Sequence, residues 1–218
     1  MARKIVFLAH RARETFARWR AEHGPFEHVQ FDELISFEHT RLKPLSVAVM
    51  SVVGERCILG VGVAQVPASG SIAKRSREKY GLRRDLSHSM RKRVLQSCAP
   101  HLSPGVRIDT DEHQRYRNEI RQSIRSAVHH QYPSIRGSLT GLGELKRTGY
   151  DPLFPINHTL AMMRDNIKRL ARRTWCTTKK KHSLENLLTI YLHYHNTRLI
   201  PAVAAPDEKR TAGQLASF

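Results

Sequence analysis

Cysteine and long apolar runs are scarce in this sequence of 218 residues. The three cysteines, Cys57, Cys98 and Cys176, are isolated and form no Cys-x-x-Cys pair, so neither a disulfide framework nor a cysteine-rich zinc site is indicated. The apolar run near the start, residues 5–9, is too short for the core of a signal peptide, and no later run approaches membrane length. We therefore expect a cytoplasmic protein with reduced cysteines and no membrane partner.

Acidic residues are also few, because 19 Asp and Glu stand against 37 Lys and Arg and give a formal net charge of +18. This excess argues against an ordinary metabolic enzyme and favours a polyanionic partner. The cations are spread over several segments, whereas membrane-surface binders usually concentrate them on one amphipathic helix. Nucleic acid is therefore the expected partner, and an RNA-binding role stays open beside DNA binding.

Apolar periodicity predicts an α/β chain with a basic helix first, then three consecutive strands, then alternating helices and strands. Helices are expected over residues 3–23, 86–102, 112–124, from 156 onward and 184–199, and strands over 28–34, 44–53, 57–66, 106–111 and 126–132. The basic segment that begins at Pro67 is expected to form a loop leading into the helix that begins at residue 86, and residues 133–149 to form a second loop.

This element order is that of an RNase H-like fold, a mixed five-stranded sheet that begins with a three-strand antiparallel meander and is flanked by helices. The chain then divides into a basic N-terminal helix or arm over residues 1–27, an RNase H-like catalytic domain over 28–200 and a flexible tail over 201–218.

The segment from Ile156 to Lys181 combines an apolar stripe with a cationic face. The stripe predicts one packed helix face and consists of Ile156, Leu160, Met163, Ile167 and Leu170. A neighbouring row on the same helix is Asn157, Ala161, Arg164, Lys168 and Arg172. Eight Lys or Arg and one acid lie between residues 164 and 181. A solvated helix face is the plain alternative, but such faces usually interleave Glu with Lys.

We expect these cations to contact phosphates, and they are Arg164, Lys168, Arg169, Arg172, Arg173, Lys179, Lys180 and Lys181. Trp175 either stacks on an unpaired base or plugs the space between this helix and the next.

Two aspartates lie where this fold would bring them together. Asp32 lies midway along the first strand and Asp111 at the end of the fourth, and those strands are neighbours in an RNase H-like sheet. Paired carboxylates repel each other unless a cation binds them, and Mg²⁺ prefers such hard oxygen ligands. Each acid alone has a structural alternative, since Asp32 could cap a turn and Asp111 a helix. Asp109, Glu33 and Asp165 are further candidate ligands.

Several blocks resemble the bacterial insertion-sequence transposases of the IS-one type. They are Phe31-Asp32-Glu33, Thr110-Asp111 followed by Tyr116, and Arg164-Asp-Asn-Ile-Lys-Arg-Leu-Ala-Arg-Arg-Thr174 followed by Thr177, Thr178 and Lys179. The resemblance covers about residues 28 to 196, and the last block is its most specific part.

This resemblance implies a DDE-type recombinase with Mg²⁺ or Mn²⁺ as cofactor, which cuts element ends and joins the freed 3′-OH to target DNA. It implies Asp32 and Asp111 as catalytic metal ligands, and a homo-oligomer on bacterial, nucleoid-associated DNA. The family's catalytic Glu falls on Asn157, which offers a carbonyl oxygen but no negative charge. Asn157 therefore either completes the site, or is replaced by Asp165 or Glu144, or marks an inactive copy.

The family also carries a zinc-binding segment and a helix-turn-helix ahead of its catalytic domain, and about 27 residues precede the first strand here. Either the basic helix 3–23 supplies a reduced DNA-binding arm, or an upstream product supplies recognition, or the frame is truncated. The alternative to a transposase is a catalytically inactive DNA-binding remnant or regulator of such an element.

Overall fold

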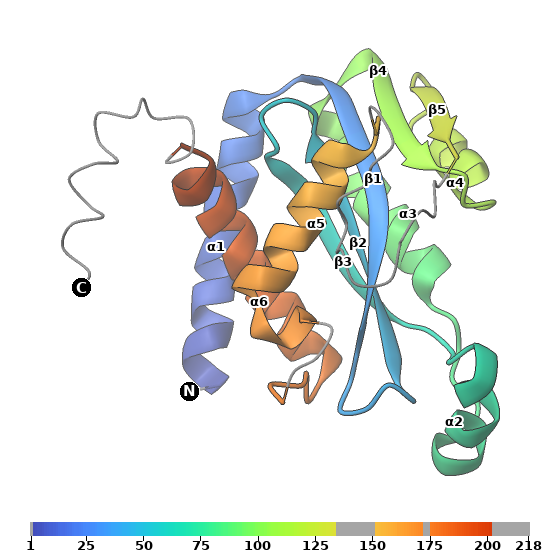
Figure 1. The fold of residues 1–218 in the computed structure, drawn as a ribbon. Coiled ribbons are helices and arrows are strands. Elements are labelled where there is room, and N and C mark those ends of the chain that lie inside the picture. Colours follow the sequence, from blue (N-terminus) through green and yellow to red (C-terminus); the bar gives the residue numbers. More distant parts are fainter. Residues whose placement is uncertain (1, 134–150, 172–174, 202–218) are drawn as a thin grey trace.

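The computed structural model describes residues 2–133, 151–171 and 175–201. A mixed sheet of five strands in the order β3-β2-β1-β4-β5 forms its centre (Figure 1). The strands are β1 (Phe26–Phe37), β2 (Pro44–Val52), β3 (Ile58–Gln65), β4 (Leu102–Asp111) and β5 (Val128–Tyr132). β1, β2 and β3 form an antiparallel meander, and β4 and β5 run parallel to β1. The predicted fold class is confirmed, and the sheet is consistent with an RNase H-like fold.

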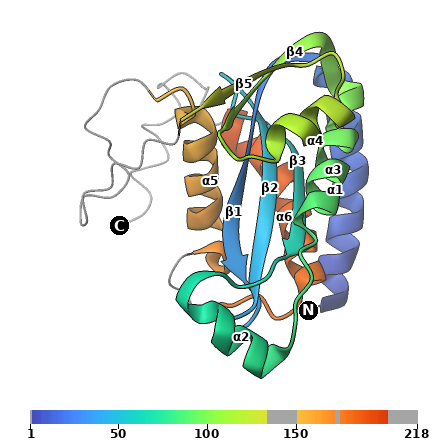
Figure 2. The ribbon, with the colours of Figure 1, turned by 90° about the vertical axis from the view of Figure 1, so that its right-hand side faces the viewer.

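Helices cover both faces of this sheet. They are α1 (Ala2–His23), α2 (Ala73–Tyr80), α3 (Ser87–Cys98), α4 (Tyr116–Ser123), α5 (Phe154–Asn166) and α6 (Lys181–Tyr194). Short helical turns occur at Gly70–Ile72, Ala99–His101, Lys168–Leu170 and His195–Leu199. Figure 2 shows α5 on one side of the sheet and α3 and α4 on the other. α6 shares the α5 side, and α1 packs against α6.

Strand alternation separates the interior into two cores. In β1, Val29 and Phe31 face α3 and α4, whereas Leu34 faces α5 and α6. Successive side chains of a strand point to opposite faces, and burying a Val, Leu or Phe side chain contributes roughly 2 kcal/mol. Asp32, between Phe31 and Glu33, therefore points toward α5.

Two glycines of β3 let α3 lie unusually close to the sheet. A Cβ at Gly60 would come within 2.5 Å of Cys98 Sγ, and one at Gly62 within 2.7 Å of Val94 Cγ2. Real Cβ atoms do not approach that closely, so any side chain here would push α3 outward. The missing side chains thus set the spacing on the α3 face.

β3 is an edge strand whose two ends are covered. Arg20 of α1 donates to Leu59 O at 3.2 Å, and Leu86 N donates to Gln65 O at 3.1 Å. The edge carbonyls at both ends therefore have partners from neighbouring segments.

The predicted continuous helix from Ile156 through Arg172 is wrong. α5 ends at Asn166, Ile167 adopts an extended conformation with φ −110° and ψ 94°, and a 3₁₀ turn follows over Lys168–Leu170. The apolar stripe is nevertheless buried, since Ile156, Leu160, Met163, Ile167 and Leu170 are each at most 4% exposed. Ser36 Oγ of β1 donates to Arg169 O at 3.2 Å. The break lets Ile167 and Leu170 follow the twisted sheet, which a straight helix would leave.

Other boundaries differ less. Residues 73–80, expected within a loop, form α2, whose buried Ser76 hydroxyl donates to Leu42 O at 2.6 Å. α4 begins at Tyr116 rather than at residue 112, because Asp111 and His113 form a turn first. The predicted loop over 133–149 lies almost wholly outside the described residues, as do the predicted tail beyond residue 201, Glu144, Arg172 and Arg173.

Helix α1 lies against the rest of the molecule along its length. Ala9, Ala12 and Phe16 are buried, and Arg13 Nη2 donates to Asn186 Oδ1 of α6 at 2.7 Å. Within the described ranges, no helix is both long enough and apolar enough to cross a membrane.

Candidate active site

Asp32 and Asp111 lie at matching positions on adjacent parallel strands. The register pairs Gln30 of β1 with Asp109 of β4, and Asp32 and Asp111 come two residues later on each strand. Paired residues share a face, so both carboxylates point toward the α5 side. Neighbouring strands are about 4.8 Å apart, which places the two side chains within reach of a shared ligand. The structure thus brings together the two aspartates that the sequence singled out.

The Asp32 carboxyl lies in a strained electrostatic environment. Burial raises its pKa from 3.8 to about 7, and the negative charges of Asp111 and Glu33 add to the rise. A hydrogen bond from Glu33 N, 2.6 Å from Asp32 Oδ1, and the positive charge of Arg164 oppose it. A neighbouring carboxylate that raises the pKa of Asp32 favours binding of a cation, which would relieve the repulsion.

Asp111 ends its strand in a turn that orients it. Its Oδ1 accepts a hydrogen bond from His113 N at 3.1 Å, and its backbone oxygen accepts one from Gln131 Nε2 at 3.3 Å. The first residue of α4 is Tyr116, so Asp111 supports the turn before the helix rather than capping the helix itself.

A side chain of β1 fixes the start of α5, where Asn157 lies. The buried Gln30 amide nitrogen donates a hydrogen bond to Pro152 O at 2.7 Å, and its Oε1 accepts a hydrogen bond from Ile156 N at 2.9 Å. The first N–H groups of a helix have no partner within the helix, so Gln30 satisfies one of them and anchors α5 to the sheet. Gln30 was not identified from the sequence, because its partners lie more than 100 residues away.

Asn157 lies in the first turn of α5, half-buried, one residue after this anchor. Its Nδ2 donates to Asp151 Oδ2 at 3.3 Å, so its amide nitrogen is used in the turn that precedes the helix. α5 runs alongside β1, as the contacts from Gln30 to Ile156 and from Ser36 to Arg169 show. Arg164, two turns after Asn157 in α5, lies close enough to lower the pKa of Asp32. The row of Asn157, Ala161 and Arg164 therefore faces the β1 side that carries Asp32.

Glu33, a candidate ligand from the sequence, belongs instead to a buried network on the opposite face. Arg91 of α3 donates to Glu33 Oε2 at 3.0 Å and to both carboxylate oxygens of Glu119 at 2.6 and 2.7 Å. Tyr116 Oη donates to Glu33 Oε2 at 3.2 Å, and Ser46 Oγ donates to Glu33 Oε1. This network holds β1 against α3 and α4 directly behind Asp32.

The charges of this network are balanced locally. Burial alone would raise the pKa of Glu119, but its hydrogen bonds with Arg91 and with His88, 2.7 Å away, outweigh burial and lower it. Burial and the charges of Glu33, Asp32 and Asp111 raise the pKa of Tyr116, so its hydroxyl stays a hydrogen-bond donor. Arg91 and Glu119 were missed from the sequence, since a charged residue in an amphipathic helix usually faces water.

The other described candidate acids either pair with cations or face solvent. Asp109 is buried in ion pairs with His28 at 2.7 Å and Arg107 at 2.9 Å. Asp165 is exposed on α5. Within the described residues, no three Asp, Glu, His or Cys side chains gather as a group that could hold a metal ion.

The predicted phosphate-binding residues are divided among several elements. Arg164 lies in the last turn of α5, and Lys168 and Arg169 lie in the 3₁₀ turn that follows. Lys179 and Lys180 are exposed before α6, whereas Lys181 begins α6 and pairs with Glu185 at 2.6 Å. Trp175 is fully exposed, so the interpretation of Trp175 as a plug between helices is wrong, and it remains accessible for stacking.

The donor set at Asp32 and Asp111 fits a divalent metal such as Mg²⁺. Both groups are hard oxygen ligands, and the sheet register places them side by side. Burial, followed by the negative charges of Asp111 and Glu33, raises the pKa of Asp32, and a bound cation would offset these effects. Asp32 and Asp111 would hold the ion, and Asn157 lies on the same α5 row as Arg164, with its side-chain nitrogen hydrogen-bonded to Asp151.

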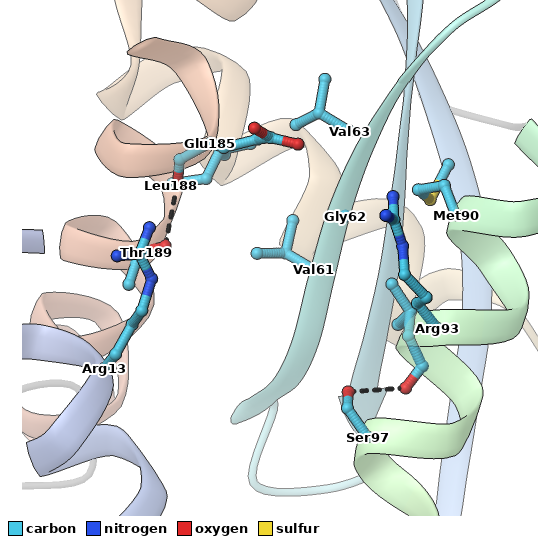
Figure 3. Close-up of a pocket in the computed structure, with 11 residues that line it drawn as sticks. Arg13, Val61, Gly62, Val63, Met90, Arg93, Ser97, Glu185, Leu188 and Thr189 are labelled. Atoms are coloured by element: carbon cyan, nitrogen blue, oxygen red, sulfur yellow. Dashed lines mark hydrogen bonds between the residues drawn. The ribbon is translucent and has the colours of Figure 1, made fainter. Parts of the chain in front are cut away.

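A hollow at the opposite edge of the sheet does not share this chemistry. It has a volume of about 340 Å³ and lies between α3 and α6 beside β3, where Figure 3 shows Arg13 and Glu185 on the α6 side and Arg93 on the α3 side. It lacks paired carboxylates, so the candidate active site remains the one at Asp32 and Asp111.

The chain was compared with protein-family models and with curated proteins. No family model matches the chain, and no curated protein matches it.

Proposed function

We propose that this chain is a DNA transposase that catalyses metal-dependent strand cleavage and 3′-OH strand transfer at insertion-element ends. The observation that carries the proposal is the pair of carboxylates at matching positions of β1 and β4, in a sheet with the RNase H strand order. The sequence resemblance to IS-one-type transposases supports the same assignment of Asp32 and Asp111.

The protein's own groups would position the DNA phosphate at this edge of the sheet. Arg164, close enough to act on the charge of Asp32, is placed to attract a phosphate beside the carboxylates. The network around Glu33 and Arg91 holds β1 in place from behind, so Asp32 can keep its orientation when charge gathers in front of it. A divalent metal bound by the two aspartates would activate the attacking water or 3′-OH and neutralise charge on the phosphate.

The second candidate is a DNA-binding remnant or regulator that no longer cuts. Asn157 favours it, because an amide in place of a third carboxylate holds a divalent metal more weakly and cannot act as a base. The absence of a three-acid group in the described part of the chain points the same way.

Cleavage assays on the DNA that flanks the gene test these candidates, with Mg²⁺ or Mn²⁺ and with labelled strands. We expect nicking and strand transfer by the wild type, and a loss of at least about 10³-fold for Asp32→Ala and for Asp111→Ala. Glu78→Ala, an exposed acid on α2, serves as the matched control and keeps wild-type activity. Tight binding without cleavage under either metal would favour the remnant instead.

A further inference from the structure

A second hollow, of about 490 Å³, opens between α4 and β5 at the edge of the sheet farthest from β3. Ile120 and Ala127 supply its apolar part. Its charged part consists of Arg117 and Arg121 of α4, Arg125 just beyond that helix, and His129 of β5. Arg117 and Arg121 are one helical turn apart and therefore lie on the same side of α4.

Among the described residues, the three arginines differ from their neighbours because no acid pairs with them. Arg107 pairs with Asp109 at 2.9 Å and Arg115 pairs with Asp85 at 3.6 Å. Over the ranges that the structure describes, Arg117, Arg121 and Arg125 form no ion pair, although all three are exposed. An arginine without an acidic partner keeps all its donors available for a phosphate.

A comparison of the two hollows distinguishes the arginine cluster beside β5 from the general positive charge of the chain. The hollow beside β3 also contains two arginines, Arg13 and Arg93, but Glu185 lies among them. Among the residues that the structure describes, no acid lines the hollow beside β5. Its lining there is therefore positive, with Asp109 of β4 as a nearby negative charge.

The pKa of His129 responds to burial and to the positive charge around it. Burial lowers its pKa first, and the positive charges of Arg117 and His130 lower it further. Its Nε2 lies 2.9 Å from Thr110 Oγ1, which holds the ring against β4. The imidazole therefore tends to stay neutral while the arginines supply the charge.

The hollow lies on the other face of the sheet from the two aspartates. The β4–β5 register pairs His129 with Ile108, and Ile108 is buried in the core beneath α3 and α4. Asp32 and Asp111 point toward α5. α4 begins five residues after Asp111, so the hollow is near the candidate active site without being part of it.

We propose that the hollow formed by Arg117, Arg121, Arg125 and His129 binds the backbone phosphates of a duplex DNA other than the strand held at the carboxylates. Its identification as target DNA rests on the proposed function, whereas the binding of duplex phosphates does not. The apolar part of the hollow accommodates the sugar edge of the strand, and the arginines contact successive phosphates.

The salt dependence of DNA binding tests the hollow directly. Full-length wild type is compared with the triple variant Arg117→Ala/Arg121→Ala/Arg125→Ala, using fluorescence anisotropy of a short labelled duplex of arbitrary sequence over a series of salt concentrations. Each phosphate contact contributes about 0.9 to the slope of log affinity against log salt, so the slope should fall by roughly 2 to 3.

A second triple variant removes the same charge elsewhere. Arg75 and Arg77 are exposed on α2, and Arg84 is exposed just beyond that helix. Their replacement by Ala should change the slope by less than about one contact. An equal fall for both triple variants would overturn the proposal, because it would show only the effect of net charge. A fall that appears with an RNA duplex and not with DNA would overturn it as well.

Cleavage and joining separate this proposal from the proposed function. If both hold, the hollow variant still nicks element ends but joins them to target DNA about tenfold more slowly. Wild type that never cleaves contradicts the proposed function and leaves the slope comparison to decide the hollow. Normal joining together with an unchanged slope contradicts the hollow alone.

Discussion

Asp32 and Glu33 are adjacent in β1, yet their carboxylates lie in opposite situations. Glu33 points toward α3 and α4 and has three partners, Arg91, Tyr116 and Ser46. Asp32 points toward α5, has the like charge of Asp111 beside it, and has a pKa of about 7. On one face of the strand, cations and hydroxyls within the chain stabilise the carboxylate, whereas on the other face burial and a like charge oppose its ionisation. Two neighbouring acids of one strand can therefore differ in electrostatic environment because they face different cores.

The largest effect should come from removing the charge of Asp32. The pKa of Asp32 in the folded protein is about 7, above the ordinary 3.8. Its contribution to the free energy of unfolding is therefore fully present below pH 3.8 and is lost as the pH rises from there to about 7. The loss amounts to roughly 4 kcal/mol. Without divalent metal, Asp32→Asn should escape that loss and exceed wild type in stability above pH 7.

Urea unfolding across this pH window, with a chelator present, measures the effect. Glu78→Gln should follow wild type because Glu78 is exposed. Parallel pH profiles for wild type and Asp32→Asn would show that Asp32 is no more strained than Glu33, and the contrast between the two faces would fail.

Arg91→Met tests the other face. Removing the guanidinium leaves Glu33 and Glu119 without their shared cation, and breaking a buried ion pair in this way costs about 3 to 5 kcal/mol. Lys92→Met, at an exposed position next to it, should change the free energy of unfolding by less than about 0.5 kcal/mol. Equal urea midpoints for both variants would contradict the structural role of the network.

Packing on the α3 face can be altered without touching charge. Gly62→Ala places a Cβ within 2.8 Å of Met90 Cγ, and overpacking of this kind costs about 1 to 3 kcal/mol. Met90→Ala in the same background should recover part of that loss, which a double-mutant cycle measures. A Gly62→Ala protein as stable as wild type would show that α3 can move away from the sheet freely.

A third carboxylate can be added on the α5 side of the sheet by replacing Asn157. Asn157→Asp adds a carboxylate near Asp32 and Asp111, so the affinity for Mg²⁺ should rise about tenfold, or 1.4 kcal/mol. Thermal unfolding over a Mg²⁺ titration reports this binding apart from activity. Asn186→Asp on α6 should leave the Mg²⁺ dependence unchanged, and the same response in both variants would argue against a site at Asn157.

The smallest effect on stability is expected at Trp175, which packs on neither face. Its side chain is fully exposed, so Trp175→Ala should change the free energy of unfolding by less than about 0.5 kcal/mol. The affinity for single-stranded DNA should nevertheless fall, because an exposed indole can stack on a base. Unchanged affinity for a single strand would remove Trp175 from the proposed DNA contacts.

The sheet could be predicted because each strand carries its own period of apolar residues. Asp32 alternates with Val29, Phe31 and Glu33 along the strand, so the sequence places it on the opposite side of β1 from those three residues. The break at Ile167 could not be predicted, since Ile167 and Leu170 fit the helical period whether or not the helix continues. The end of the helix depends on how this segment packs against the sheet, including the hydrogen bond from Ser36 to Arg169. Those contacts involve residues far apart in the sequence.

The candidate site shows the same division. Asp32 and Asp111 were found because the strand order makes their strands neighbours. Arg91 and Glu119 were not found, because the sequence gives no sign that either faces the interior, and only the packing of α3 on α4 makes them partners. The role of Gln30 in anchoring α5 likewise depends on a loop far along the chain.

The covered ends of β3 have a consequence for how this protein behaves when crowded. Open sheet edges recruit strands from other molecules and lead to aggregation. Here Arg20 and Leu86 donate hydrogen bonds to carbonyls at either end of the edge strand. Gly60 and Gly62 have no side chains against which another strand could pack. Copies of the chain at high concentration can therefore keep their sheets separate.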